Sequence, residues 1–167
     1  MRREEFFIYL YFNLFTFTFY LNFKMKLEAK IDWQDGLAFQ AHLDGFDFVI
    51  DGSPEAGGRN LGPRPKGLTL VSLLGCTAMD VISILGKMKV KVKKFSVSAA
   101  ALTADEHPKK ILAVKVTYDF TGVELNPEPL LKAIALSEEK YCGIRATLAP
   151  AVAISHEIVL NGEKVPG

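Results

Sequence analysis

Residues 66–89 have the sequence KGLTLVSLLGCTAMDVISILGKMK, which predicts one long helix. Its apolar residues cover nearly the whole circumference, a pattern typical of a buried helix rather than a surface helix. Pro65 comes just before it, where proline is tolerated. Gly75 and Gly86 lower the helix propensity, so we expect them to allow close packing against a neighbouring element. The centre of the fold is therefore predicted to be a long buried helix.

The segment before this helix has the pattern of a β meander. In residues 26–52, the turn signals Asp35-Gly36 and Asp44-Gly45 separate short runs that contain Leu, Phe, Val and Ile. Residues 53–65 are rich in glycine and proline and are expected to form a loop.

The segment after the helix begins with two strands. Residues 90–104 and 110–122 alternate with period two and are predicted to pair around the turn DEHP, residues 105–108. The chain is then expected to enter a second helix, over residues 126–142.

That second helix has a clear start signal. Asn126 is a candidate N-cap, Pro127 stands at the first helical position, and Glu128 favours the helix dipole from the first turn. Residues 143–163 are predicted to close the chain with a β-like segment. The order strands, helix, strands, helix, strand indicates an α+β domain with a mainly antiparallel sheet.

The composition excludes several classes of protein. The chain has 167 residues, of which 49% are hydrophobic and 23% charged, as is ordinary for one soluble globular domain. A net charge of +1, with scattered Lys and Arg, argues against a nucleic-acid partner and makes membrane binding unexpected. Two cysteines are too few for a secreted disulfide framework and indicate buried thiols or one redox pair. We expect a cytoplasmic protein.

Residues 1–24 differ from the rest, because they hold ten of the eighteen aromatic residues. Residues 6–23 are long and apolar enough for a membrane anchor, but Asn and Thr residues interrupt them and part of the run alternates like a strand. The other interpretations are an extra strand or helix and a start codon assigned too early, with Met25 as the natural beginning. We treat residues 1–24 as an atypical extension and residues 25–167 as a single domain.

Cys76, in the middle of the long helix, has two interpretations. Cysteine is among the residues most often buried, and one in an apolar helix commonly serves as packing. A reactive thiol needs a cause that lowers its pKa. The helix dipole cannot supply this cause, because its effect fades within the first turn and Cys76 lies roughly 15 Å along the axis from Lys66. Asp80 shares the face of Cys76 and would disfavour a thiolate if both residues were buried. Nothing near Cys142 defines its role either, so the residues alone leave both interpretations open.

A resemblance to a known family adds to this picture. The stretch GPRPKGLTLVSLLGCTAMDVISIL, then DEHP, ALSEEKYC and ATL, resembles the OsmC/Ohr family of thiol-dependent peroxidases over about residues 26–163. Several separate pieces fall in order: Pro65, Gly75-Cys76, His107-Pro108, and Cys142, 66 residues after Cys76. GCTAMDV and SEEKYC resemble the OsmC-like branch more than the organic-hydroperoxide-resistance branch.

This resemblance implies a fold and a chemistry. It implies an intertwined homodimer, in which sheets from both chains wrap around long central helices and two sites lie at the interface. Cys76 would attack an organic hydroperoxide and become a sulfenic acid, Cys142 would condense with it to a disulfide, and a dithiol such as a lipoyl group would reduce that disulfide. The family implies no metal or cofactor, and His42, His107 and His156 are far apart in the sequence.

Two positions differ from the active members that the resemblance brings to mind. Those members carry an arginine in the N-terminal strands, but here no Lys or Arg lies between Lys30 and Arg59. They also carry a glutamate ten residues before the first cysteine, where this chain has Lys66. A cation that stabilises the thiolate must therefore come from elsewhere. The candidates are Lys66 of a second chain, and Arg59, Arg64 and Arg145.

Other polar residues are expected to have structural roles: Glu138 and Glu139 as surface helix residues, and His107 as part of a turn. Two functional hypotheses follow. One is a cysteine-based hydroperoxide reductase. The other is a non-enzymatic or weakly active dimeric stress protein that binds a small hydrophobic ligand or senses the redox state.

Overall fold

The computed structural model describes residues 27–165 of the chain. The proposed extension of residues 1–24 lies outside the described residues, so the alternatives for it stay open. The chain divides into two compact units, which meet in sequence between Arg64 and Pro65. Each unit is described by itself.

The first unit contains the predicted meander. Strands β1 (Ala29–Asp35), β2 (Ala38–Leu43) and β3 (Phe46–Ile50) form an antiparallel sheet in that order. The β2–β3 hairpin turns at Asp44 and Gly45, which both have positive φ angles of 51° and 82°. A two-residue turn of this kind favours Asp-Gly, which confirms the sequence prediction.

The predicted loop after β3 contains one short 3₁₀ turn, η1 (Pro54–Ala56). Asp51 organises it, because this buried carboxylate accepts hydrogen bonds from the backbone N–H groups of Gly52, Arg59 and Leu61. The N–H of Leu61, followed by those of Arg59 and Gly52, lowers the pKa of Asp51, so the carboxylate stays charged and keeps these bonds.

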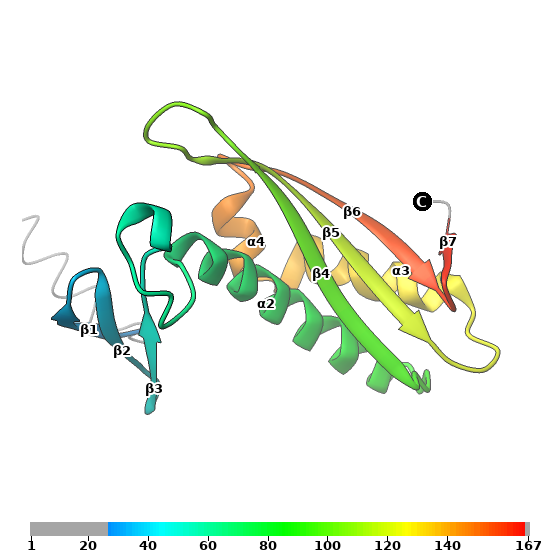
Figure 1. Ribbon diagram of the computed structural model, residues 1–167. Helices are drawn as coiled ribbons and strands as arrows, with labels where there is room; N and C mark the ends of the chain where they lie inside the picture. The colour runs from blue at the N-terminus through cyan, green and yellow to red at the C-terminus, as the bar shows by residue number, and fades with distance from the viewer. Residues whose placement is uncertain (1–26, 166–167) are drawn as a thin grey trace, which may run out of the picture. The chain divides into compact units, whose positions relative to one another are not determined.

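The second unit places helices on one face of a sheet (Figure 1). The long helix α2 (Pro65–Lys87) confirms the first prediction. The sheet has the order β4-β5-β6-β7, from β4 (Lys94–Thr103), β5 (Ile111–Thr121), β6 (Ala153–Leu160) and β7 (Glu163–Val165). The predicted pairing of β4 with β5 is antiparallel, as expected.

Between β5 and β6 the chain forms α3 (Pro127–Leu136), a π-helical turn η2 (Ser137–Tyr141) and α4 (Gly143–Leu148). The predicted β-like segment is therefore wrong for residues 143–148, where the chain forms one more short helix. This helical crossover returns the chain in the original direction, so β6 runs parallel to β5 and the sheet is mixed.

The core of the second unit lies between the sheet and the helices. Alternate residues of β5 point into it, which explains the period-two pattern. They meet buried residues of α2 and α3. The largest fully buried side chains of this core are Val114, Val116, Tyr118, Phe120, Leu73, Val81, Leu85, Leu130 and Ile134.

Within this chain α2 buries one face only. Val71, Met79 and Ile82 are exposed, Met79 by 68%. A Cβ added at Gly75 would meet only the end of the Met79 side chain, at 3.9 Å, and one added at Gly86 would meet nothing within 4 Å. The described residues thus provide no neighbour for which these glycines make room. By length and hydropathy α2 could also cross a membrane, a property that core helices of soluble proteins share.

Candidate dithiol site

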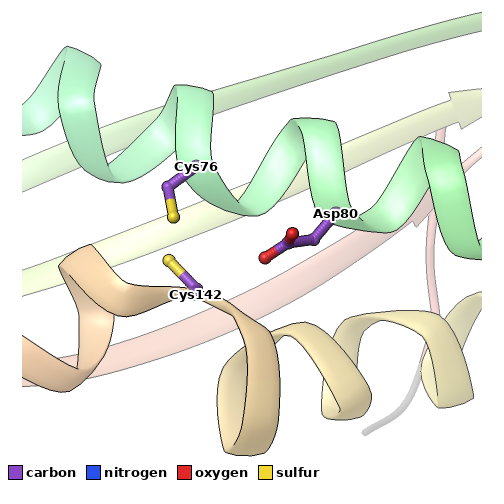
Figure 2. A group of neighbouring side chains, drawn as sticks. All are labelled: Cys76, Asp80 and Cys142. Atoms are coloured by element: carbon purple, nitrogen blue, oxygen red, sulfur yellow. The ribbon is translucent and has the colours of Figure 1, made fainter. Parts of the chain in front are cut away.

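The structure brings the two cysteines together (Figure 2). The sulfur atoms of Cys76 and Cys142 and a carboxylate oxygen of Asp80 all lie within 4.8 Å of one another. Both thiols are free. Cys76 and Asp80 are four residues apart on α2, so they share a face, as the helical spacing predicted. Cys142 comes to them from the junction between η2 and α4.

The backbone at this junction fixes the position of Cys142. Its N–H donates to the carbonyl of Ser137 at 2.8 Å and so closes the π turn. Cys142 itself has an extended conformation, with φ −73° and ψ 94°, which ends one helix and begins the next. Its sulfur acts as the N-cap of α4 by accepting a hydrogen bond from the backbone N–H of Arg145 at 3.4 Å. The short helix α4 therefore aims this thiol at α2.

The two thiols have different environments. Cys142 is only 3% exposed, whereas Cys76 is partly exposed. Burial, together with a hydrogen bond to Cys76, raises the pKa of Cys142 to about 11. Cys142 is therefore a protonated thiol at neutral pH, and Cys76 is the sulfur that solvent can reach.

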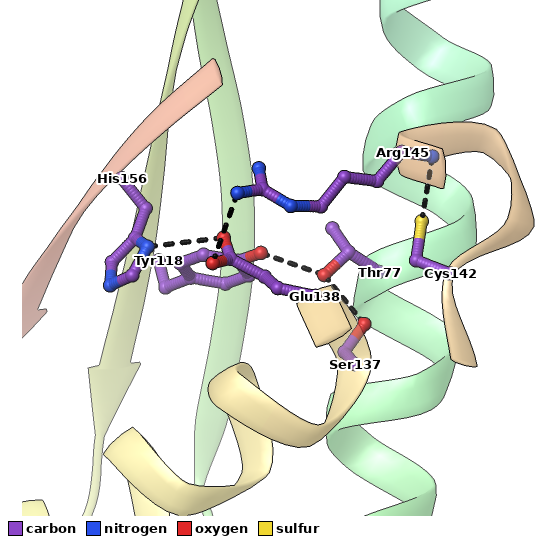
Figure 3. A network of polar contacts seen from close by, with 7 residues as sticks. All are labelled: Thr77, Tyr118, Ser137, Glu138, Cys142, Arg145 and His156. Carbon is purple, nitrogen blue, oxygen red and sulfur yellow. Dashed lines mark hydrogen bonds and ion pairs between the residues drawn. The ribbon is translucent and has the colours of Figure 1, made fainter. Parts of the chain in front are cut away.

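A chain of hydroxyl groups runs from Tyr118 through Thr77 to Ser137 (Figure 3) and continues to Asp80. Ser137 Oγ donates to Asp80 Oδ2 at 3.0 Å. Because that bond uses the only hydroxyl proton of Ser137, Thr77 must donate to Ser137 across 3.0 Å, and Tyr118 to Thr77 across 2.7 Å. Burial raises the pKa of Tyr118 to about 12, so its proton remains available. The network fixes the orientation of the Asp80 carboxylate.

A second polar group surrounds Glu138 (Figure 3). Its carboxylate lies 3.0 Å from His156 Nδ1 and 3.4 Å from Arg145 Nη2. The side chain is only 11% exposed, so the prediction of a surface role for Glu138 is wrong. Packing of η2 against β6 and α4 buries it, and the sequence pattern of α3 contains no sign of that packing. Glu139 is exposed, as predicted.

The four candidate cations have defined partners. Lys66 Nζ donates to the carbonyl of Lys109 at 2.6 Å. In the first unit, Arg59 pairs with Asp35 at 3.2 Å, and Arg64 donates to the carbonyl of Gly62 at 3.5 Å.

Arg145 is the candidate that the structure brings to a thiol, although by its backbone, while its guanidinium pairs with Glu138. The role of each candidate stays a prediction. His107 lies in the β4–β5 connection, the expected turn.

Several residues of the site were not identified from the sequence. Thr77, Tyr118 and Ser137 form the hydroxyl chain, and His156 contacts Glu138. The one available signal was helical spacing, because Thr77 lies three residues before Asp80 on α2 and therefore on the same side of the helix. The other residues are brought in by β5, β6 and η2.

Fold and site together define a class: an α+β protein with two free thiols, one buried and one partly exposed, between a long helix and a helical crossover. The sequence profile of OsmC-like proteins matches residues 57–157. The chain therefore belongs to the OsmC/Ohr family, and the resemblance inferred from its motifs is confirmed.

Relatives of this chain share its fold over most of its length. Protein YhfA of Escherichia coli (strain K12) is 30% identical over 131 residues, which cover 78% of this chain and 95% of YhfA. A crystal structure of a hypothetical protein from Aquifex aeolicus has 25% identity and a TM-score of 0.70, covering 82% of this chain and 98% of the other. An organic hydroperoxide resistance protein from Elizabethkingia anophelis has 15% identity and a TM-score of 0.65, with coverage of 83% and 98%. The predicted OsmC-like α+β fold is confirmed.

Proposed function

We propose that this chain is a cysteine-based hydroperoxide reductase that acts in the cytoplasm as a homodimer. The observation that carries the proposal is the meeting of Cys76 and Cys142, from helices far apart in the sequence, within 4.8 Å. Names of structural relatives, such as the organic hydroperoxide resistance protein from Elizabethkingia anophelis, support the substrate class.

The reaction has three balanced steps. The Cys76 thiolate attacks the terminal oxygen of ROOH, and the O–O bond breaks. With one proton, this step leaves Cys76 sulfenic acid and ROH. The Cys142 thiol then attacks the sulfenic sulfur, which releases water and forms the disulfide. A dithiol reductant, such as a lipoyl group, returns both cysteines to thiols and becomes a disulfide itself.

The environments of the two sulfurs suit this division of roles. Cys76 is the more accessible sulfur and can meet a peroxide, whereas buried Cys142 keeps its proton and avoids direct oxidation. The N–H of Arg145 points at Cys142 Sγ and stabilises negative charge there when Cys142 attacks. A short move of the η2–α4 junction would bring the sulfurs to bonding distance.

Turnover of cumene hydroperoxide with a lipoyl or dithiothreitol reductant tests this proposal. Wild-type protein should consume peroxide and Cys76→Ser should not, while Cys142→Ser without reductant should stop at the Cys76 sulfenic acid and form no disulfide within the chain. The proposal would be refuted if the wild-type protein consumed peroxide no faster than Cys76→Ser. Intact-mass measurement adds a direct check, because one equivalent of peroxide should remove two hydrogens per chain.

Two observations favour the alternative, a weakly active or non-enzymatic stress protein. The guanidinium of Arg145 is paired with Glu138 rather than with a thiol. Asp80 also places a carboxylate beside both sulfurs. In this alternative, peroxide forms the disulfide slowly, if at all, and a small hydrophobic ligand binds. Single-turnover oxidation rates separate the two, since a reductase must oxidise Cys76 much faster than free cysteine reacts.

A further inference from the structure

The three side chains at the centre of the site have the chemistry of metal ligands. Two thiols and one carboxylate, from Cys76, Cys142 and Asp80, present ligand atoms within 4.8 Å of one another. In a tetrahedral zinc site the ligand atoms lie roughly 3.5 to 3.8 Å apart, because Zn–S bonds are about 2.3 Å and Zn–O bonds about 2.1 Å. Small side-chain rotations would therefore bring all three onto one ion.

We propose that the reduced protein binds one Zn²⁺ ion through Cys76, Asp80 and Cys142. Thiolates select zinc over magnesium and calcium, which prefer oxygen ligands only. Metal-bound cysteines are deprotonated, so two thiolates and one carboxylate would surround the ion. This site goes beyond peroxide reduction and does not depend on it.

Hydrogen bonds around the cluster hold two of its three ligands in place. Ser137 donates to Asp80 Oδ2, and the hydroxyl chain behind it includes Thr77 and Tyr118. Hydrogen bonds of this kind orient a ligating carboxylate and are the usual support of metal ligands. Cys142 is held by two hydrogen bonds: its N–H donates to the Ser137 carbonyl, and its sulfur accepts the N–H of Arg145. Asp80 and Cys142 are thus positioned before any ion arrives.

There is space beside one ligand of the site. Asp80 lines a cavity of about 290 Å³, whose other lining residues are Ser83, Ile84, Lys87, Met88, Leu136 and Tyr141. Three protein ligands leave the fourth tetrahedral position to water or to an external ligand. Zinc binding and the Cys76–Cys142 disulfide exclude each other, because both use the same sulfur electrons. Oxidation would therefore release the ion, so the metal content of this site would report the redox state.

The test uses the full chain, reduced and handled without oxygen. Zinc is added and the excess is removed by dialysis. The number of zinc ions per chain is then measured by inductively coupled plasma mass spectrometry. A competition titration with a coloured zinc chelator gives the affinity. Replacement by Co²⁺ should give thiolate-to-cobalt charge-transfer bands and the strong visible bands of a tetrahedral ion, a readout that needs no variant.

We expect one zinc ion per wild-type chain. Cys76→Ser and Cys142→Ala should each abolish stoichiometric binding, and Asp80→Asn should weaken it by about tenfold or more. Glu139→Gln is the matched control, because Glu139 is an exposed carboxylate on η2 and should leave the affinity unchanged.

Three results would overturn the site: no stoichiometric zinc on the wild type, cobalt bands without thiolate character, or equal affinity in Asp80→Asn. Peroxide turnover of the chelator-treated protein is measured separately, so failure of the zinc site and failure of the reductase are distinguishable.

Discussion

At the scale of single residues, the two cysteines differ in exposure. Cys142 is buried and its sulfur accepts a backbone N–H, whereas Cys76 is partly exposed. In the proposed reaction this burial would keep Cys142 from direct oxidation, and it also raises the pKa of Cys142 to about 11. That shift has a consequence for stability at alkaline pH.

The stability of the reduced, metal-free protein should fall as the pH rises from about 9 to about 11. In this range the Cys142 thiol of the unfolded chain, with an ordinary pKa of 9.0, loses its proton, but the folded chain keeps it. The unfolded state then binds fewer protons, so the free energy of unfolding decreases with pH. Urea unfolding at pH 8, 9 and 10 measures this slope.

Cys142→Ala should be less stable overall, because it leaves a small cavity, but its stability should depend less on pH. Tyr118 contributes to the pH dependence of both proteins, so the difference between the two slopes reports mainly Cys142. Equal slopes for wild type and variant would show that Cys142 titrates normally in the folded protein.

At the scale of elements, the crossover α3–η2–α4 forms the site. The sequence predicted one helix over residues 126–142, and the structure resolves it into α3 and a π turn. The wider turn ends the helix at Cys142 and allows α4 to begin there. Because η2 and α4 follow directly from α3, the N-cap of α3 should contribute to the stability of the whole second unit.

Asn126→Ala should lower the free energy of unfolding by about 1 kcal/mol. Asn126 Oδ1 accepts the backbone N–H of Glu128 at 3.0 Å, and alanine cannot replace that bond. Asn126→Ser, which can still cap the helix, should stay near wild type. Chemical denaturation compares the three proteins, and a loss as large in Asn126→Ser would contradict the capping role.

At the scale of the whole molecule, the exposed apolar face of α2 is the surface that the predicted second chain would cover. The sequence of α2 is apolar all round, yet one chain buries only the face toward the sheet and α3. Exposed apolar surface of this kind typically marks a protein interface. The predicted homodimer, in which two long helices pack together, would cover Val71, Met79 and Ile82.

Wild-type protein should sediment as a dimer, and Met79→Lys should shift it toward the monomer. A lysine at the centre of an apolar helix interface would bury a charge without a partner. Val123→Lys is the control, because Val123 is 85% exposed in the loop after β5. Analytical ultracentrifugation over a range of concentrations measures the change, and a monomeric wild type would refute the dimer.

Much of the fold could be predicted from residue order, because its causes are local. Period-two alternation marks β4 and β5, Asp44-Gly45 suits a two-residue hairpin turn, and Asn126 caps α3. Helix α4 could not be predicted, because six residues carry too little periodic signal beside the strand that follows. The parallel direction of β6 was also missed, since it depends on the path of the whole crossover.

The candidate site divides in the same way. The face shared by Cys76 and Asp80 follows from helical spacing alone, and the family motifs pointed to Cys142 as the partner. The distances among them, the burial of Glu138 and the hydroxyl chain from Tyr118 to Asp80 exist only in the folded protein. The reason is physical: burial and hydrogen bonding between distant segments depend on how α2, β5 and η2 pack, and no local pattern of residues encodes that packing.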